Sequence, residues 1–304
     1  MVVSTLRTLF ASRWQLLVWS VEALNYLVHV VLRPQPWNRV SQAAGYALWA
    51  LQLACFVRCQ LTEVPRLDAT WQEHAAAGLE PSERCPRTGL QVPPRARFVR
   101  SAGRIILGFD HYCIWLGTPV GAHNRKHFLL FVFYSATFCA MGSVHSIYEL
   151  TYAMPVRQRQ PPFPWLMRTP KENVAIRLAQ QSATWKEFGQ HSMYGAKFGI
   201  LERIEWFSLV LGKGGLYAWM VYVSTFANVV GAVLLIGFGS HHLYMVLRNE
   251  TSLQSGPSAY DLGYTRNWQQ VFGQRAWLWA LPVDGHGQAR GYNYPLKSQQ
   301  GHAE

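Results

Sequence analysis

Four consecutive residues, Asp110-His111-Tyr112-Cys113, bring a carboxylate, an imidazole and a thiol together in one short stretch. A thiol acts as a nucleophile mainly in its thiolate form, and a neighbouring imidazole can take its proton. A carboxylate beside the imidazole can fix its tautomer and stabilise the imidazolium. The stretch therefore predicts a cysteine nucleophile with its base and the group that orients the base.

An isolated D-H-x-C sequence more often reflects a buried cysteine near a surface histidine. The residues around this one argue against that alternative, because the stretch continues as FDHYCIWLGTPVGAHNRKHF and leads directly into an apolar segment. We therefore expect the acid, the base and the thiol at the edge of a membrane span.

The same stretch resembles the catalytic core of the DHHC family of protein S-acyltransferases, or palmitoyltransferases, whose pattern is roughly DHHCxWVxNCVGxxNxxxF. Tyr112 replaces the second histidine, a variant that also occurs in the family. Further elements match in the family's order, over roughly residues 84–130 and 240–282: Cys85-Pro86-Arg87, Pro93-Pro94-Arg95, Gly103-Arg104, Asn249 to Gln254, Asp261-Leu262-Gly263, Asn267 to Gly273 and Leu281-Pro282. Several motifs in the same order are far more specific than one.

The resemblance implies a protein S-acyltransferase that moves a palmitoyl group from palmitoyl-CoA to cysteines of substrate proteins. Cys113 would first take the acyl group as a thioester and then pass it on, with His111 as the base and Asp110 as the group that orients it. The implied partners are acyl-CoA, membrane-associated proteins with cytosolic cysteines, and the lipid bilayer. No permanently bound cofactor is expected.

The resemblance also assigns supporting residues. Arg95 and Arg97 align with basic positions that face the coenzyme, although a solvated or lipid-facing role is an equal alternative for either one. Trp115 would line the entrance to the site. Ser252 aligns with a residue that contacts the catalytic acid, with a helix cap as the alternative at this position. Asn267 is expected to organise its own loop through bonds from its side chain to the backbone.

The chain departs from the family in its cysteine-rich domain, which binds two structural zinc ions through eight Cys and His ligands. The corresponding positions here hold Cys85, Thr88, Phe98, Ile105, Val99, Ala102, Tyr112 and Pro119. Because tetrahedral zinc needs about four ligands and only Cys85 is a good one, we expect no zinc. An apolar cluster is expected to replace the metal, formed by Phe98, Val99, Ile105 and Ile106.

Four apolar runs are long enough to be considered as membrane spans, at residues 16–32, 42–57, 128–150 and 216–247. A helix needs about 20 residues to cross the hydrocarbon core, so the first two runs are short and the last two ample. Buried helices of a soluble protein are the alternative. Together with the resemblance, the runs predict an all-α membrane protein with four transmembrane helices, a cytosolic loop domain that carries the DHYC motif, and a cytosolic C-terminal tail.

The predicted organisation follows from these runs. The N-terminus and first transmembrane hairpin occupy residues 1–58, and a cytosolic DHYC-containing domain, which is a degenerate cysteine-rich domain, occupies residues 59–127. A third transmembrane helix at 128–150 and a fourth at 216–247 are separated by a long luminal loop at 151–215. A cytosolic tail with TTxE-like and C-terminal family motifs follows at 248–304. Arginines before the third run favour a cytosolic loop, and acyl-CoA is cytosolic. We expect a protein of the endomembrane system, in the Golgi or the endoplasmic reticulum.

The formal charge of +12 is compatible with nucleic acid, an anionic lipid surface or an anionic ligand. No basic helix or pattern of stacking aromatics supports nucleic acid, so a lipid surface and coenzyme phosphates are the better interpretations. Two other functions stay open. A catalytically inactive family member would act as a membrane adaptor or chaperone. An ion- or solute-handling protein would use Glu22 and His29, but the fourth run offers almost no polar partners for them.

Overall fold

The computed structural model describes residues 39–148 apart from 66, 79 and 80, residues 215–285 apart from 255–258, and pieces within 20–24, 150–151 and 291–297. Almost all of the predicted span at 16–32, and nearly the whole of the predicted loop at 151–215, lie outside the described residues. The chain divides into two units, one of which includes residues 34–139 and 230–304 and contains the DHYC motif. The other includes residues 140–229.

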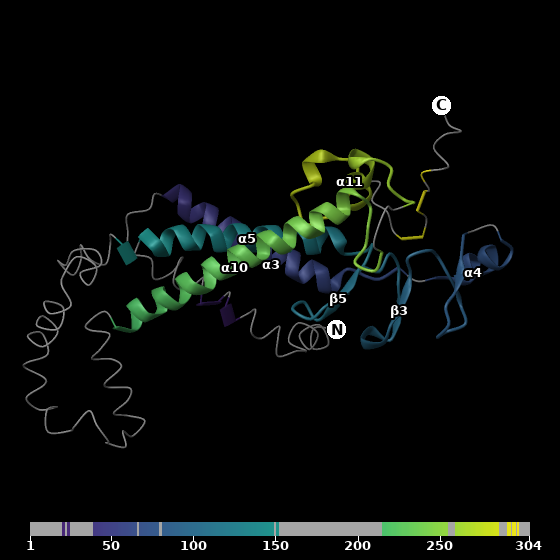
Figure 1. The fold of residues 1–304 in the computed structure, drawn as a ribbon, viewed down its shortest axis with the longest axis horizontal. Coiled ribbons are helices and arrows are strands. Elements are labelled where there is room, and N and C mark those ends of the chain that lie inside the picture. The colour runs from purple at the N-terminus through teal and green to yellow at the C-terminus, as the bar shows by residue number, and fades with distance from the viewer. Residues whose placement is uncertain are drawn as a thin grey trace, which may run out of the picture. The chain divides into compact units, whose positions relative to one another are not determined.

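Three long helices coincide with three of the four apolar runs (Figure 1). They are α3 (Arg39–Leu61), α5 (Arg125–Tyr148) and α10 (Gly215–Leu247). Among the described residues, two stretches are long and apolar enough to cross a membrane, Arg125–Tyr148 and Met220–Leu247. The structure is therefore mostly helical, as predicted, with two candidate spans in its described part.

Small residues allow α5 and α10 to pack closely in the unit that holds the DHYC motif. A side chain at Gly239 would place its Cβ 3.2 Å from Val132 Cγ1, and one at Gly231 would lie 3.3 Å from Cys139 Sγ. The opposite face of α10 exposes large apolar side chains, among them Val233, Leu234 and Ile236. One close-packed face and one exposed apolar face are the features expected of a helix that borders lipid.

The segment between α3 and α5 corrects the expectation of an all-α fold, because it contains three antiparallel hairpins beside the short helix α4 (Ala69–Ala76). The hairpins pair β1 (Glu83–Arg84) with β2 (Gln91–Val92), β3 (Arg97–Val99) with β4 (Arg104–Ile106), and β5 (His111–Cys113) with β6 (Thr118–Val120). Gly103 and Gly117 have φ values of 64° and 65° in the second and third turns. Glycine adopts such values without steric cost, so the chain can reverse within a few residues.

Two apolar clusters hold these hairpins, where the sequence predicted one. Phe98 and Ile105 are cross-strand partners and pack against the buried residues Cys85, Val92, Ala96 and Leu107. Val99 and Ile106 belong to a second cluster with Val64. Neighbouring residues of a strand point to opposite faces, so Phe98 and Val99 cannot share one cluster.

The main core gathers residues from α3, the β5–β6 hairpin, α5, the end of α10 and helix α11 (Tyr264–Phe272). Its fully buried members include Cys55, Leu116 and Val120. Lys126, in the first turn of α5, is also fully buried, and its Nζ donates to the carbonyl oxygens of Leu278 and Val283 at 2.8 and 2.7 Å. The segment after α11 is thereby tied to the start of α5.

Candidate active site

Strand β5 brings the predicted base and nucleophile together. Successive side chains of a strand point to opposite faces, so His111 and Cys113 share one face and Tyr112 occupies the other. Burial agrees with this alternation, because Cys113 is 7% exposed in the main core and Tyr112 is 38% exposed. The local strand is what allows the residues at the first and third positions of H-Y-C to cooperate.

The turn that follows Cys113 closes the hairpin and exposes apolar side chains. The Gly117 N–H donates to the Cys113 carbonyl oxygen at 2.8 Å, and the Tyr112 hydroxyl donates to the Gly117 carbonyl oxygen at 3.2 Å. Ile114 and Trp115 lie in this turn, and each is 45% exposed. Trp115 therefore stands beside the nucleophile in a turn whose outer surface is apolar.

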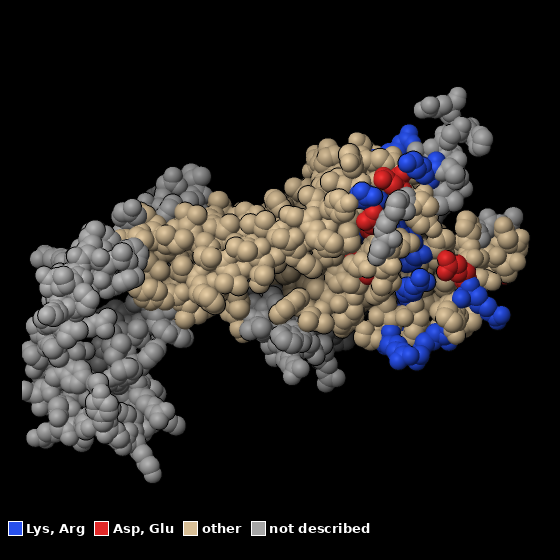
Figure 2. Space-filling view, in the orientation of Figure 1, with Lys and Arg blue, Asp and Glu red and all other residues tan. Residues whose placement is uncertain are grey.

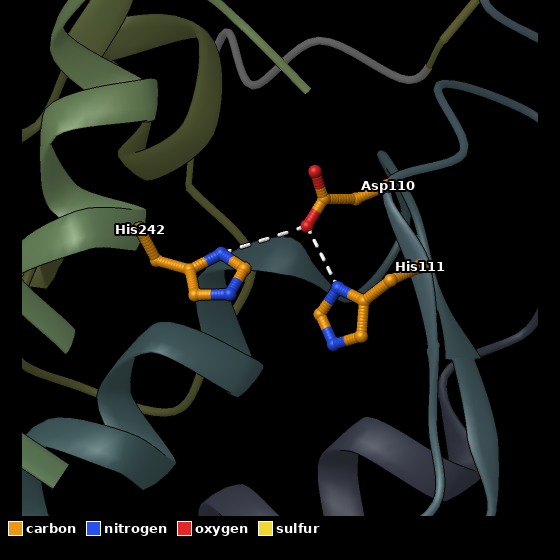
Figure 3. A group of neighbouring side chains, drawn as sticks. All are labelled: Asp110, His111 and His242. Atoms are coloured by element: carbon orange, nitrogen blue, oxygen red, sulfur yellow. Dashed lines mark hydrogen bonds and ion pairs between the residues drawn. The ribbon is translucent and has the colours of Figure 1, made fainter. Parts of the chain in front are cut away.

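The Asp110 carboxylate is completely buried and is held from both sides. Its Oδ2 interacts with His111 Nδ1 (Figure 3), at a distance of 2.8 Å. Its Oδ1 accepts hydrogen bonds from the Ser252 N–H at 2.8 Å and the Ser252 hydroxyl at 3.3 Å. Arg125 Nη2 lies 3.9 Å from Oδ1. These contacts orient the carboxylate and neutralise its charge within the protein.

The protonation of this pair is set by competition between burial and these contacts. Burial alone would raise the pKa of Asp110, but the hydrogen bond from His111, the charge of Arg125 and the Ser252 N–H outweigh it and hold the pKa well below its usual value. Burial alone would lower the pKa of His111, but the Asp110 hydrogen bond and the Cys113 sulfur raise it to about 9. At neutral pH the pair is therefore a carboxylate with an imidazolium.

The ring nitrogen of His111 that faces away from Asp110 is the atom able to exchange a proton with the thiol. This nitrogen, Nε2, is buried and has no hydrogen-bond partner among the described residues. An imidazolium beside a cysteine stabilises the thiolate, which is the reactive form. The arrangement can thus supply a thiolate nucleophile and, after reaction, a proton for a leaving group.

Two residues of the tail, Ser252 and Asn267, make contacts that connect the tail to the rest of the site. Ser252 contacts Asp110 directly, as described above. Asn267 accepts a hydrogen bond from the Leu262 N–H at 3.0 Å through Oδ1, and its Nδ2 donates to the Leu247 carbonyl oxygen at 2.7 Å and to Asp261 at 2.6 Å. Asn267 therefore joins the end of α10 to the loop that precedes α11.

The two arginines expected to face the coenzyme lie in different environments. Arg95 is buried, and its guanidinium donates to Gln254 Oε1, to Asn249 Oδ1 and to the Asn249 carbonyl oxygen at 2.9, 2.9 and 2.5 Å. Its charge also lies over the rings of Tyr260 and Tyr294, at 4.8 and 4.9 Å. Arg95 is therefore a link within the protein, and its contact with a coenzyme phosphate stays a prediction. The Arg97 side chain is 56% exposed and remains accessible to a phosphate.

Two residues near the motif were missed by the sequence reasoning. Arg125 begins α5, lies near Asp110 and donates to the Glu250 carbonyl oxygen at 2.7 Å. His242 of α10 places Nδ1 3.6 Å from Asp110 Oδ2 (Figure 3). The available signal was the ionisable pair His241-His242 inside an otherwise apolar run.

The residues at the positions of the family's zinc ligands do not fit that metal. Cys85 is buried, and the aligned residues Phe98 and Ile105 pack against its cluster. Elsewhere in the described ranges, Asp110, His111 and His242 bring potential ligand atoms within 4.8 Å of one another. The oxygens of that carboxylate already contact His111 and accept hydrogen bonds from Ser252.

Comparison with known proteins agrees with the geometry. The family model for DHHC palmitoyltransferase matches residues 79–256, which include the three hairpins, α5, α10 and the Ser252 segment. The chain is 27% identical over 225 residues to palmitoyltransferase ZDHHC15 of Homo sapiens, covering 70% of this chain and 50% of the relative. It is 25% identical over 236 residues to palmitoyltransferase PFA3 of Yarrowia lipolytica, covering 68% and 47%.

A plant relative, probable protein S-acyltransferase 12 of Arabidopsis thaliana, is 29% identical over 205 residues, covering 66% of this chain and 53% of the relative. The chain thus spans about half the length of these curated relatives. The family model covers more than half of the chain, and the matched segment carries the Asp110, His111 and Cys113 arrangement described above. The chain belongs to the DHHC palmitoyltransferase family.

Proposed function

We propose that the protein is an S-acyltransferase that moves a palmitoyl group from palmitoyl-CoA to cysteines of substrate proteins through a thioester on Cys113. The observation that carries the proposal is the arrangement on β5. Asp110 binds one nitrogen of His111, and the strand places His111 and Cys113 on the same face. Relatives named as palmitoyltransferases support this substrate class.

In the first exchange the Cys113 thiolate attacks the carbonyl carbon of palmitoyl-CoA. A bond forms between Cys113 Sγ and that carbon, the bond to the coenzyme sulfur breaks, and the departing thiolate takes a proton from the His111 imidazolium. In the second exchange His111 accepts the proton of a substrate thiol, whose sulfur attacks the acyl-enzyme. Cys113 then leaves as a thiolate, and the imidazolium is restored. Asp110 orients the ring in both exchanges.

The membrane placement is part of the proposal. Four spans, of which α3, α5 and α10 provide three and residues 16–32 the first, would place the loop domain and the tail on the cytosolic side, where acyl-CoA is found. We favour a Golgi or endoplasmic reticulum membrane. The exposed apolar turn at Ile114 and Trp115 lies beside the nucleophile, which fits a thioester at the membrane interface with its acyl chain among apolar side chains.

Basic residues of the loop domain are the proposed contacts for the coenzyme phosphates. Figure 2 shows Lys and Arg side chains gathered over this part of the chain, and its exposed arginines include Arg84, Arg87, Arg97, Arg100 and Arg104. Arg97 is the member that the family pattern selects. Several exposed guanidinium groups near one another attract a polyanion and bind its phosphates in a bidentate manner.

The purified protein should be incubated with labelled palmitoyl-CoA and examined for a label that hydroxylamine removes. We expect Cys113→Ser to abolish this label. Cys139→Ser is the matched control, because Cys139 is also buried but lies on α5, away from the strand that carries His111. A folded wild-type protein without label would refute the transferase and favour an adaptor, and a label that follows Cys139 would refute the assignment of the nucleophile.

A further inference from the structure

His242 occupies an unusual position on α10. It is 4% exposed, although the helix contains no Asp, Glu, Lys or Arg. An ionisable side chain in such a helix is costly unless it faces the protein interior and has a partner there. The adjacent His241 is exposed, so burial is a property of this position and not of the residue type.

The partner of His242 is the catalytic carboxylate. His242 Nδ1 lies 3.6 Å from Asp110 Oδ2, the same oxygen that His111 Nδ1 approaches at 2.8 Å (Figure 3). This separation is slightly too long for a hydrogen bond, and Nδ1 is buried without a hydrogen-bond partner in the described part of the chain. A movement of about half an ångström would complete the bond.

The ring of His242 also forms part of the wall around the catalytic base. Its centroid lies 5.2 Å from that of His111, with the planes tilted by 44°. Phe128 packs edge-on against both imidazoles, with centroids at 5.0 Å in each case, and Phe238 packs against His242 at 4.5 Å. The three rings of His111, Phe128 and His242 therefore form a triangle with sides of 5.0–5.2 Å, in which His111 packs beside both neighbours.

The other charged and titratable groups around the site come from several elements. Arg125 of α5 and Arg95 of the turn before β3 both act on Asp110 through their charges, and Cys59 of α3 is a neighbour of Cys113 in the main core. Oδ1 of Asp110 has Ser252 and Arg125 as partners. Oδ2 has His111 and, from a separate helix, His242.

We propose that His242 is a positioning residue, which holds the Asp110 carboxylate and the His111 ring in the orientation that lets His111 act on Cys113. In this role its Nδ1 carries the proton and faces Asp110 Oδ2, while its ring packs beside that of His111. It links helix α10 to the catalytic strand. The catalytic part of this role rests on the proposed function. The effect of His242 on the reactivity of Cys113 can be measured without any acyl transfer.

Three variants separate the polar contact from simple packing. His242→Phe keeps an aromatic ring against Phe128 and Phe238 but removes the N–H. His242→Asn places an amide N–H near the position of Nδ1 and is the conservative variant. His241→Phe makes the same change at the exposed neighbour and is the matched control.

Two readouts are compared for each folded variant. The first is the rate at which labelled palmitoyl-CoA labels the protein. The second is the pH profile of alkylation of Cys113 by iodoacetamide, followed on the Cys113 peptide by mass spectrometry. We expect His242→Phe to slow labelling about tenfold and to move the alkylation profile about one pH unit upward, the effect of losing one weak contact to a charged group. His242→Asn should recover most of both, and His241→Phe should match the wild type.

A wild-type profile and labelling rate in His242→Phe would overturn the proposal, because the ring would then serve packing alone. An equal shift in His242→Asn and His242→Phe would overturn it as well, since the N–H would not matter. If the wild type is never labelled by palmitoyl-CoA, the proposed function fails, and the alkylation profiles still decide the role of His242.

Discussion

Arg95 and Asn249, 154 positions apart in the sequence, form a buried hydrogen bond of 2.9 Å between Arg95 Nη1 and Asn249 Oδ1. Both residues have positive φ values, 67° and 51°, and they are the non-glycine residues with this feature in the described part of the chain. Such backbone conformations cost free energy and persist where surrounding contacts fix them. The bond therefore marks a place where the loop domain and the segment after α10 are fixed to each other.

Arg95→Gln should lower the free energy of unfolding by about 1–3 kcal/mol, because it leaves the buried side-chain and carbonyl oxygens of Asn249 without their donors. Arg97→Gln is the matched control, since the Arg97 side chain is 56% exposed and its loss should change stability by less than about 0.5 kcal/mol. Thermal unfolding in detergent measures both. Equal melting temperatures for the two variants would contradict the structural role of Arg95.

His111→Ala should slow acylation of Cys113 by roughly two to four orders of magnitude, the usual range for the loss of a group that transfers protons. Asp110→Asn should also be severe, because the ring would lose its orienting charge. Single-turnover labelling with palmitoyl-CoA measures both rates. Normal autoacylation in His111→Ala would remove His111 from the mechanism.

Stability should fall as the pH rises from about 6.5 to about 9. The pKa of His111 is raised from 6.5 to about 9 in the folded protein, so its protonated form stabilises the fold fully below 6.5, and this contribution is lost as the pH passes 9. Integrated over that interval, it amounts to about 3 kcal/mol. Melting temperatures across this range should decline more in the wild type than in His111→Gln. Parallel profiles would show that His111 does not titrate as inferred.

The apolar hairpins predict stability without zinc. Ile106 is fully buried, so Ile106→Ala should cost about 2–5 kcal/mol, whereas Phe98→Ala should cost less because the ring is only partly buried. A chelator should change neither the melting temperature nor acylation. Near-stoichiometric zinc by elemental analysis, together with unfolding in chelator, would be incompatible with this account.

The helices and the motif were predictable for clear physical reasons. The runs at 128–150 and 216–247 are long and nearly free of charge, and a continuous apolar run of this length is typical of a helix, which satisfies its backbone hydrogen bonds within one segment. The D-H-x-C spacing predicted an acid, a base and a thiol that act together. The structure then shows Asp110 bonded to His111 and the side chain of Ser252 on the same carboxylate.

The remaining features depend on contacts that a local pattern does not contain. Strands of two or three residues are too short to show an alternating pattern, so the hairpins were missed and one apolar cluster was expected instead of two. Arginine is normally exposed, and the burial of Arg95 depends on partners far along the chain. His242 was overlooked because its partner lies on another element.

The buried ammonium of Lys126 has a consequence for how the molecule is made. Its acceptors at Leu278 and Val283 lie 152 and 157 residues further along the chain. At ribosomal speed, roughly 8–30 s separate the synthesis of Lys126 from that of Leu278. During that interval Ser252 and Asn267 are also still missing for most of the time. The contacts around the candidate site are therefore completed only after the segments that carry Ser252, Asn267 and Leu278 have been made, and a chain that stopped before them would carry the DHYC motif without these contacts.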